Sequence, residues 1–218
     1  MIASINKNTG IIAGFTSIEP RSTFHSLQNL DLHFGQGMLK VLNDIGYSVS
    51  VIGNNMLVDK TRFDESGGYE AMDFSIVEDV SMLRSMSRNG SSIKMSYNQS
   101  THLMTIGEKN WASLMNQRRR WFEGFKTTPV WLQLIMLCKF SFLPCLIYMS
   151  LVSPWFILGF VMKLILSMLF LREIEKSVNS DNSIFVVILF EFFEPILYYS
   201  TLICSILPNK IKWKGREF

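Results

Sequence analysis

Two neighbouring carboxylates, Glu78 and Asp79, stand near the start of a segment with helical periodicity that runs from Ile76 to Asn89. Carboxylates in the first turn of a helix are stabilised by its amino terminus, so a structural role is one interpretation of the pair. The chemical interpretation is that Asp79 is a general base. An aspartate at the mouth of a pocket can accept the proton of an acceptor hydroxyl while that oxygen attacks a carbon bearing a good leaving group.

A second polar set consists of Gln117, Arg120 and Trp121, which share one face of a predicted helix because they stand at positions i, i+3 and i+4. An amide can bind a hydroxyl, a guanidinium can bind a diphosphate and an indole can stack on a sugar, so the set suits a polyhydroxylated or phosphorylated ligand. The alternative is a basic helix end that contacts anionic lipid headgroups. We expect Arg118 and Arg119 to contact headgroups in either case.

Gly53, Asn54 and Asn55 interrupt a strand-like segment. Such a sequence is typical of a bulge or turn, and its functional alternative is a loop whose backbone approaches an acceptor sugar. The histidines and cysteines show no spacing typical of a catalytic triad, a zinc site or a disulfide framework. We therefore expect surface or helix-packing histidines (His25, His33, His102), and cysteines that act as small hydrophobic residues (Cys138, Cys145, Cys204).

The elements that position these side chains are predicted in residues 1–126, where strand-like and helical patterns alternate. This alternation favours an α/β layer. So few strands leave one edge of the sheet open, and the short segment before Thr9 cannot cover it. The predicted strands are 9–18, 47–58 and 92–98, and the predicted helices are 24–42, 60–66, 76–89 and 105–122.

Residues 127–207 are strongly apolar, with Lys139 and Lys163 the only charges between Val130 and Leu171. A bilayer core of about 30 Å needs about 20 apolar residues per helix. The pattern predicts about three transmembrane helices, and residues 208–218 form a basic tail. The predicted helices cover about 130–150, 154–171 and 184–207, with Pro154 opening the second.

Basic residues precede the first predicted span and follow the second, which places both of those ends, and the polar domain, on the cytoplasmic side. Three full crossings would put the basic tail outside, so the alternative is that the last apolar run re-enters or lies partly at the interface. Glu191 and Glu194 in that run either pair with Lys139 or Lys163 inside the bundle or take part in substrate passage.

The composition is that of a membrane protein rather than an ordinary soluble one. The chain has 218 residues, of which 48% are hydrophobic and 18% are charged. Its mean hydropathy is +0.21. Soluble domains carry about 25% charged residues. The net charge of +3 is not gathered into a basic run interleaved with aromatic residues, so we expect no nucleic-acid partner.

Three motifs occur in a characteristic order: GNNMLVDKTRFDESGGYE (Gly53–Glu70), IVEDVSML (Ile76–Leu83) and QRRRW (Gln117–Trp121), which is followed at once by apolar helices. In this order they resemble the membrane-bound inverting glycosyltransferases of family 2, a group that includes cellulose and hyaluronan synthases and ceramide glucosyltransferase. QRRRW matches the QxxRW motif of that group, and the closing IKWKGREF is similar to its basic-aromatic tail. The resemblance covers roughly residues 9–218.

The resemblance implies a GT-A-like nucleotide-diphospho-sugar transferase domain and an inverting transfer from a nucleotide-sugar donor to a lipid or glycan acceptor. It implies that Asp79 is the catalytic base, and that Mg²⁺ or Mn²⁺ on the donor diphosphate stabilises the leaving group. The same resemblance assigns the substrate-binding residues Glu78, Asn54, Asn55, Gln117, Arg120 and Trp121.

The resemblance also implies that the nucleotide-binding half of the domain is missing from this sequence. The family carries a nucleotide-binding half with a metal-binding DxD ahead of these motifs, and the sequence contains no DxD. We therefore expect a partial GT-A-like domain, a fragment from a split, truncated or mispredicted gene that is inactive alone. A separate chain carrying the missing N-terminal half is one candidate partner. Two alternatives stay open: a non-catalytic membrane subunit that docks a partner, and a small transporter built around Glu191 and Glu194.

Overall fold

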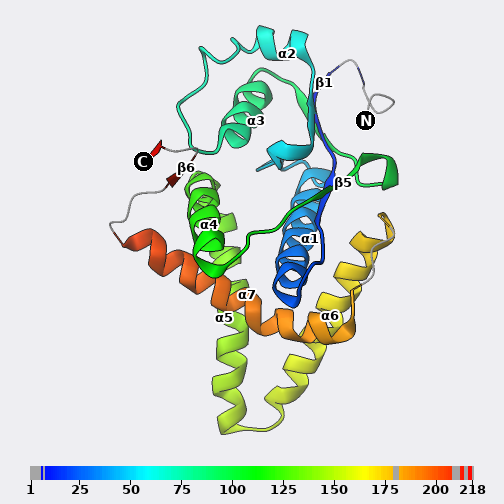
Figure 1. Cartoon of the computed structure of the whole chain (residues 1–218), viewed down its shortest axis with the longest axis vertical. Helices are drawn as coiled ribbons and strands as arrows, with labels where there is room; N and C mark the ends of the chain where they lie inside the picture. Colours follow the sequence, from blue (N-terminus) through cyan, green and yellow to red (C-terminus); the bar gives the residue numbers. More distant parts are fainter. Residues whose placement is uncertain (1–5, 7, 179–181, 208–211, 214–215, 218) are drawn as a thin grey trace.

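The computed structural model of the protein describes residues 6, 8–178, 182–207, 212–213 and 216–217. It is mostly helical, with small sheets at one end and a helical hairpin projecting at the other (Figure 1). In chain order the elements are β1 (Thr9–Ala13), β2 (Phe15–Ile18), α1 (Thr23–Asp44), the 3-10 turn η2 (Gly53–Asn55), β3 (Met56–Val58), α2 (Lys60–Glu65), α3 (Glu78–Arg88), β4 (Ser92–Met95), the 3-10 turn η3 (Gln99–Thr101), β5 (His102–Thr105), α4 (Trp111–Lys126), α5 (Val130–Val152), α6 (Phe156–Lys176), α7 (Ile184–Ile206), β6 (Lys212–Trp213) and β7 (Arg216–Glu217).

The sheets are smaller than the pattern predicted. β1 lies between β3, which is antiparallel to it, and β4, which is parallel to it. The predicted strand 9–18 is two strands divided at Gly14, and β2 pairs in parallel with β5. The predicted strand 47–58 is a strand only at β3, because the backbone turns through η2 just before it.

The helix predicted from Thr105 begins later, at Trp111. Asn110 caps it: the Asn110 side chain accepts from the backbone N–H of Ser113, and the Ser113 hydroxyl lies within reach of the Asn110 backbone N–H. Such a capping box supplies partners for groups that the first turn leaves unpaired. The helix therefore excludes the residues before Asn110. Thr105 belongs to β5, a strand that was not predicted.

The open sheet edge predicted from the sequence is covered by amide side chains of α1. Gln36 of α1 accepts from the backbone N–H of Thr16 at 2.8 Å and donates to the Thr16 carbonyl at 2.7 Å. Asn29 of α1 accepts from the N–H of Ile18 at 2.7 Å. Buried backbone groups need such partners, and here side chains replace a neighbouring strand.

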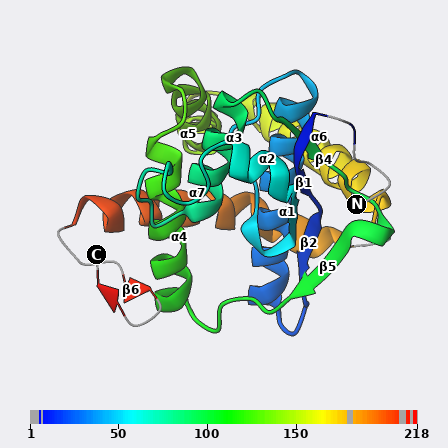
Figure 2. The same ribbon diagram turned by 90° about the horizontal axis from the view of Figure 1, so that it is seen from above.

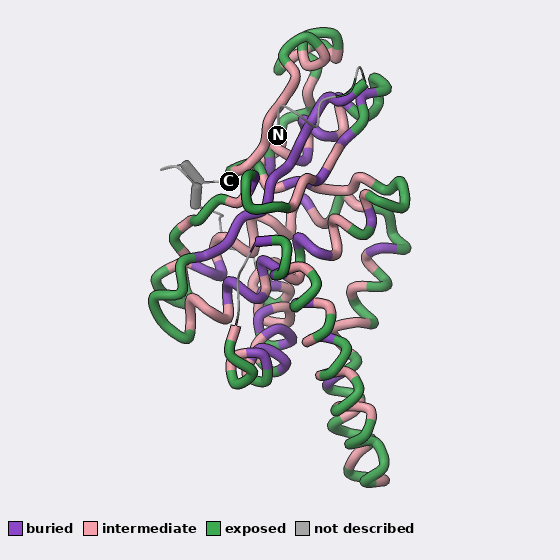
Figure 3. The backbone as a smooth tube through the Cα atoms, turned by 90° about the vertical axis from the view of Figure 1, so that its right-hand side faces the viewer, coloured by how far each residue is buried: buried purple, intermediate pink, exposed green. Residues whose placement is uncertain are grey.

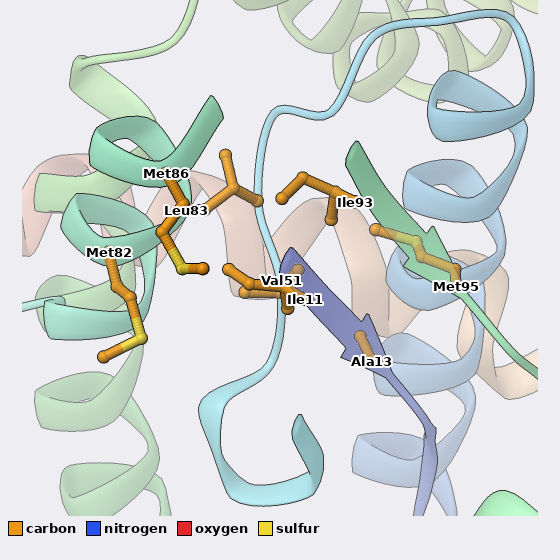
Figure 4. Packing of buried hydrophobic residues seen from close by; sticks show 8 residues of the cluster. All are labelled: Ile11, Ala13, Val51, Met82, Leu83, Met86, Ile93 and Met95. Carbon is orange, nitrogen blue, oxygen red and sulfur yellow. The ribbon is translucent and has the colours of Figure 1, made fainter. Parts of the chain in front are cut away.

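The hydrophobic core of the polar part lies between β1, β4 and α3. The buried side chains Leu83 and Met86 of α3 lie over Ile11 of β1 and Ile93 of β4, as Figure 4 shows. Gly90 follows the carboxyl end of α3 with a φ of 80°, which is the left-handed conformation that favours glycine. The core therefore fixes the position of α3, the helix that carries Asp79.

Of the three predicted spans, α5 and α7 are long and apolar enough to cross a membrane by length and composition, among the residues described. α6 carries Lys163 and further charges in its last turns, so it does not meet that test. The glutamates of α7 are paired inside the bundle, Glu194 with Lys139 and Glu191 with Lys163. This confirms the structural interpretation of both carboxylates.

Candidate functional site

The Asp79 carboxylate is held by backbone N–H groups from two elements. Its Oδ2 accepts from the N–H of Gly53 at 2.8 Å, and its Oδ1 accepts from the N–H of Val80 at 2.9 Å. A Cβ atom at position 53 would lie 2.9 Å from Asp79 Oδ2, which is closer than carbon and oxygen can approach. Glycine at the start of η2 is therefore what lets the loop backbone reach this carboxylate.

Burial raises the pKa of Asp79 above its ordinary value. The hydrogen bonds from Gly53 and Val80 and the positive charge of Arg120 act in the opposite direction, since each favours the ionised carboxylate. A carboxylate with a raised pKa is a stronger proton acceptor than an exposed aspartate. These are the properties expected of a general base.

Asp79 and Trp121 line one cavity of about 300 Å³ between α1, α3, α4 and α5. The two side chains come from elements far apart in the chain, and the sequence predicted that they would share a site. Met136 and Phe140 of α5 also line this cavity, together with the charged side chains of Arg118, Lys139 and Glu194. The cavity therefore offers both a carboxylate and apolar side chains to a ligand.

A second cavity of about 230 Å³ adjoins the first. Both are lined by Arg118, Trp121 and Glu194, and the second reaches Leu197 and Thr201 of α7. The two cavities thus share part of their lining, and the second extends to buried residues of α7.

Arg118 lies inside the protein, and the prediction that it contacts lipid headgroups is wrong. Its guanidinium lies 4.2 Å from the centre of the Trp121 ring, and its Nη2 lies 2.8 Å from Oδ2 of Asp31 on α1. Arg118 and Trp121 stand three positions apart, which places them on the same face of α4. The sequence could not show which of the three arginines faces α1.

Gln117 does not join Trp121 in the cavity lining. Its Nε2 donates to the Glu108 carboxylate at 3.0 Å, which turns the amide toward the amino-terminal end of α4. Of the three predicted residues, only Trp121 lines the cavity with Asp79. Arg120 is outside that lining and acts on Asp79 through its charge, and Gln117 is directed to another partner.

The asparagines of η2 are bound to the small sheets. Asn54 accepts from the Thr16 hydroxyl at 3.1 Å. Asn55 uses its amide to donate to the carbonyls of Phe15 and Thr101, both at 2.9 Å, which ties β2 to the residues before β5. Glu78 is exposed at the first position of α3. Contact of Asn54, Asn55 and Glu78 with substrate stays a prediction.

The family model of glycosyl transferase family 21 matches residues 1–218. The chain belongs to glycosyltransferase family 21. The motif order had predicted a glycosyltransferase, which is confirmed, but it had pointed to family 2 instead. The chain matches no curated protein and no solved structure.

Four polar residues of this family 21 chain, of which only the two histidines were considered from the sequence, lie together in its interior. Ser17 Oγ lies 2.8 Å from His33 Nε2, and His33 Nδ1 lies 3.0 Å from the Glu175 carboxylate of α6. His102 of β5 also reaches the Ser17 hydroxyl, at 2.7 Å. Ser17 is 3% exposed and His33 is fully buried, so the set joins β2, α1 and α6 away from solvent.

A polar stripe on α1 was the signal that could have revealed this interior network. Asn29, His33 and Gln36 recur at helical spacing within an otherwise apolar pattern. The apolar residues of α1 predict the helix, and this polar face predicts buried hydrogen bonds to neighbouring elements. In the part of the family 21 chain that is described, no group of three or more His, Cys, Asp or Glu side chains could hold a metal ion.

Proposed function

We propose that this protein transfers a sugar from a nucleotide-sugar donor to a hydroxyl of a lipid or glycan acceptor at a membrane surface, with Asp79 as the catalytic base. The observation that supports this most directly is the shared cavity of Asp79 and Trp121. The raised pKa of Asp79 and the family membership agree with it. Residues 1–126 form the transferase domain in this proposal, with a GT-A-like fold.

The reaction is a single displacement with inversion at the sugar carbon. The acceptor hydroxyl donates its proton to the Asp79 carboxylate as its oxygen forms a bond to the anomeric carbon. The bond from that carbon to the donor phosphate breaks, and the nucleoside diphosphate leaves with the electron pair.

Arg120 and Trp121 occupy the donor and sugar side of this arrangement. The Arg120 guanidinium is close enough to act on Asp79, and it carries the charge needed beside a diphosphate. The Trp121 indole lines the cavity, where it offers a flat surface to a sugar ring. Glu78, Asn54, Asn55 and Gln117 are proposed as further substrate contacts.

A lipid is the acceptor class that suits the cavity best. Its lining includes the Asp79 carboxylate and the apolar side chains Met136 and Phe140 of α5. An acceptor with a hydroxyl headgroup and an apolar tail would find a surface for both parts, with the hydroxyl beside Asp79 and the tail against α5. A polar glycan would leave the apolar part of the lining without a matching surface.

Asp79→Asn tests the proposal. Membranes containing the protein are incubated with a panel of radiolabelled nucleotide sugars, and transfer to endogenous lipid is measured together with donor binding. We expect the variant to lose transfer by at least 100-fold, the order of magnitude attributed to general-base catalysis, and to bind donor normally.

Asp64→Asn is the matched control, because Asp64 is exposed on α2 and should leave transfer unchanged. Near-normal turnover by Asp79→Asn would contradict the role of Asp79. No transfer by the unsubstituted protein with any donor would agree either with a non-catalytic membrane subunit or with a partial domain that is inactive alone, and donor binding without transfer would favour the partial domain.

A further inference from the structure

The hairpin formed by α5 and α6 projects from the body of the protein, and few of its residues are buried (Figure 3). Its tip is strongly apolar. Leu151 is 82% exposed, Val152 is 72% exposed and Trp155 is 76% exposed. Exposed apolar surface of this extent is typical of contact with lipid or with another protein.

The charges of the hairpin mark where it meets α7. Lys139 of α5 pairs with Glu194, and Lys163 of α6 pairs with Glu191, so both arms cross α7 at these lysines. Between the two lysines the sequence contains no Asp, Glu, Lys, Arg or His. The part of the hairpin beyond α7 therefore carries no charge, and its tip carries none either.

The length beyond this crossing is short. α5 continues from Lys139 to Val152, which is about 20 Å at a helical rise of about 1.5 Å per residue. α6 covers about 10 Å from Phe156 back to Lys163. The hydrocarbon core of a bilayer is about 30 Å thick. With α7 at the surface of the hydrocarbon layer, a tip that extends about 10 to 20 Å beyond α7 reaches the middle of the bilayer and falls short of the far side.

α7 lies across the hairpin at the base of α1 and α4 (Figures 1 and 2), and it contacts those two helices more extensively than α5 or α6. Its buried face includes Phe190 and Leu197. Its outer face exposes apolar side chains at nearly every fourth position: Ile184, Ile188, Phe192, Ile196 and Ile203. A helix with one apolar face exposed and the other packed against protein suits the surface of the hydrocarbon layer.

We propose that the α5–α6 hairpin inserts into one leaflet of the membrane without crossing it, and that α7 lies in the interface with its exposed apolar stripe against lipid. The occupant of this surface is the hydrocarbon of a single leaflet. A spanning hairpin would place the charge-free tip, with Leu151 and Val152, in water on the far side. Insertion into one leaflet keeps that tip in lipid. It also keeps the basic residues before α5 and after α7 on one side.

Cysteine labelling tests this proposal on the full chain. The three native cysteines are replaced by alanine, and single cysteines are placed by Ser153→Cys at the tip and by Ser177→Cys at the exposed carboxyl end of α6. A membrane-impermeant maleimide is added to sealed vesicles from either side. We expect Ser177→Cys to react from one side, and Ser153→Cys to react from neither side until detergent is added.

Reaction of Ser153→Cys from the side opposite to Ser177→Cys would show a spanning hairpin and overturn the proposal. Reaction from the same side would show a hairpin that is not inserted, which also overturns it. A depth measurement supplies a second readout. A fluorophore on Ser153→Cys should be quenched more strongly by lipids spin-labelled near the chain end than by lipids spin-labelled at the headgroup.

Charge insertion gives an independent test with matched variants. Ser153→Arg places a charge in mid-bilayer if the proposal is right, and we expect it to reduce the amount of membrane-inserted protein several-fold. Ser177→Arg makes the same change at the other end of α6 and should leave insertion unchanged. Equal insertion of both variants would overturn the proposal, because a tip in water tolerates an added charge. None of these readouts requires transferase activity, so they stand or fall independently of the proposed function.

Discussion

At the scale of single residues, the site depends on how Asp79 is held. Burial raises its pKa, while the N–H groups of Gly53 and Val80 keep the ionised form satisfied. A carboxylate in this environment has a higher proton affinity than an exposed aspartate, and its oxygens are held in a fixed orientation. The glycine at position 53 is part of the same device, since any side chain there would displace the carboxylate.

The pH dependence of transfer follows from this environment. The base must be ionised, and its pKa is raised, so transfer should fall as the pH decreases through a value above the ordinary aspartate range of about 3.9. The measurement is kcat/KM for transfer as a function of pH. A rate that stays constant down to that ordinary range would be incompatible with Asp79 as the base.

Gly53→Ala should raise the pH at which transfer falls on the acid side of that profile. The added Cβ forces Asp79 Oδ2 away from the Gly53 N–H, which removes a hydrogen bond that lowers the pKa of Asp79. We expect a lower kcat and an unchanged affinity for donor, because the carboxylate is displaced while the Trp121 side of the cavity is kept. An unaltered profile would mean that this hydrogen bond does not tune the base.

Asp79→Asn should not weaken the fold at neutral pH. A carboxyl whose pKa is raised in the folded protein stabilises the fold at acid pH, and this contribution is lost as the pH rises through the folded pKa. Removing the charge at neutral pH therefore leaves the unfolding temperature in detergent equal or higher. A large decrease would show that the lost activity reflects unfolding.

At the scale of elements, α1 is the helix on which the other parts are assembled. Its amides cover the edge of β2, Asp31 pairs with Arg118 of α4, and His33 reaches Glu175 of α6. Gly37 lets α1 approach α6 closely, because a Cβ there would overlap the Ile174 side chain. One helix thus connects the sheets, the site and the hairpin.

Two glycines of α1 provide a matched pair of substitutions. Gly37→Ala should destabilise the protein by about 1–3 kcal/mol, because it overpacks the contact between α1 and α6. Gly35→Ala meets open space and should stabilise the helix by up to about 1 kcal/mol. Denaturant unfolding in detergent compares the two. Equal stability of both variants would show that the helices can separate without cost.

At the scale of the whole molecule, charged pairs join the hairpin to α7. Lys139 also lies 3.9 Å from the centre of the Phe34 ring of α1, so one side chain links α5, α7 and α1. Since Glu194 is buried beside the cavity, the loss of its partner would leave an isolated charge in an apolar setting. The pairs therefore connect the hairpin to α7, and Lys139 connects both to α1.

Lys139→Met should lower the stability of the protein by about 3–5 kcal/mol, the usual cost of breaking a buried ion pair. The double variant Lys139→Met, Glu194→Leu should recover most of this loss, because it removes the stranded charge. Both are compared by unfolding temperature in detergent. A single variant as stable as the unsubstituted protein would show that Glu194 is solvated or neutral without Lys139.

The sequence by itself determined the helices α1, α3, α5, α6 and α7. It predicted one cleft lined by Asp79 with Gln117, Arg120 and Trp121, and of these three only Trp121 lines the cavity of Asp79. Apolar periodicity, glycine stops and long apolar runs are local signals, so they survive without knowledge of the fold. Its strand boundaries were less accurate, since β2, β3 and β5 depend on partners distant in the chain.

Only the tertiary structure decided which side chains meet between elements. The Arg118–Asp31 pair, the turn of Gln117 toward Glu108 and the path of α7 across the hairpin all join residues whose spacing carries no signal. The physical reason is that a helix periodicity defines a face but not its neighbour. The neighbour is chosen by packing, and in this protein packing places Arg118 of α4 against Asp31 of α1.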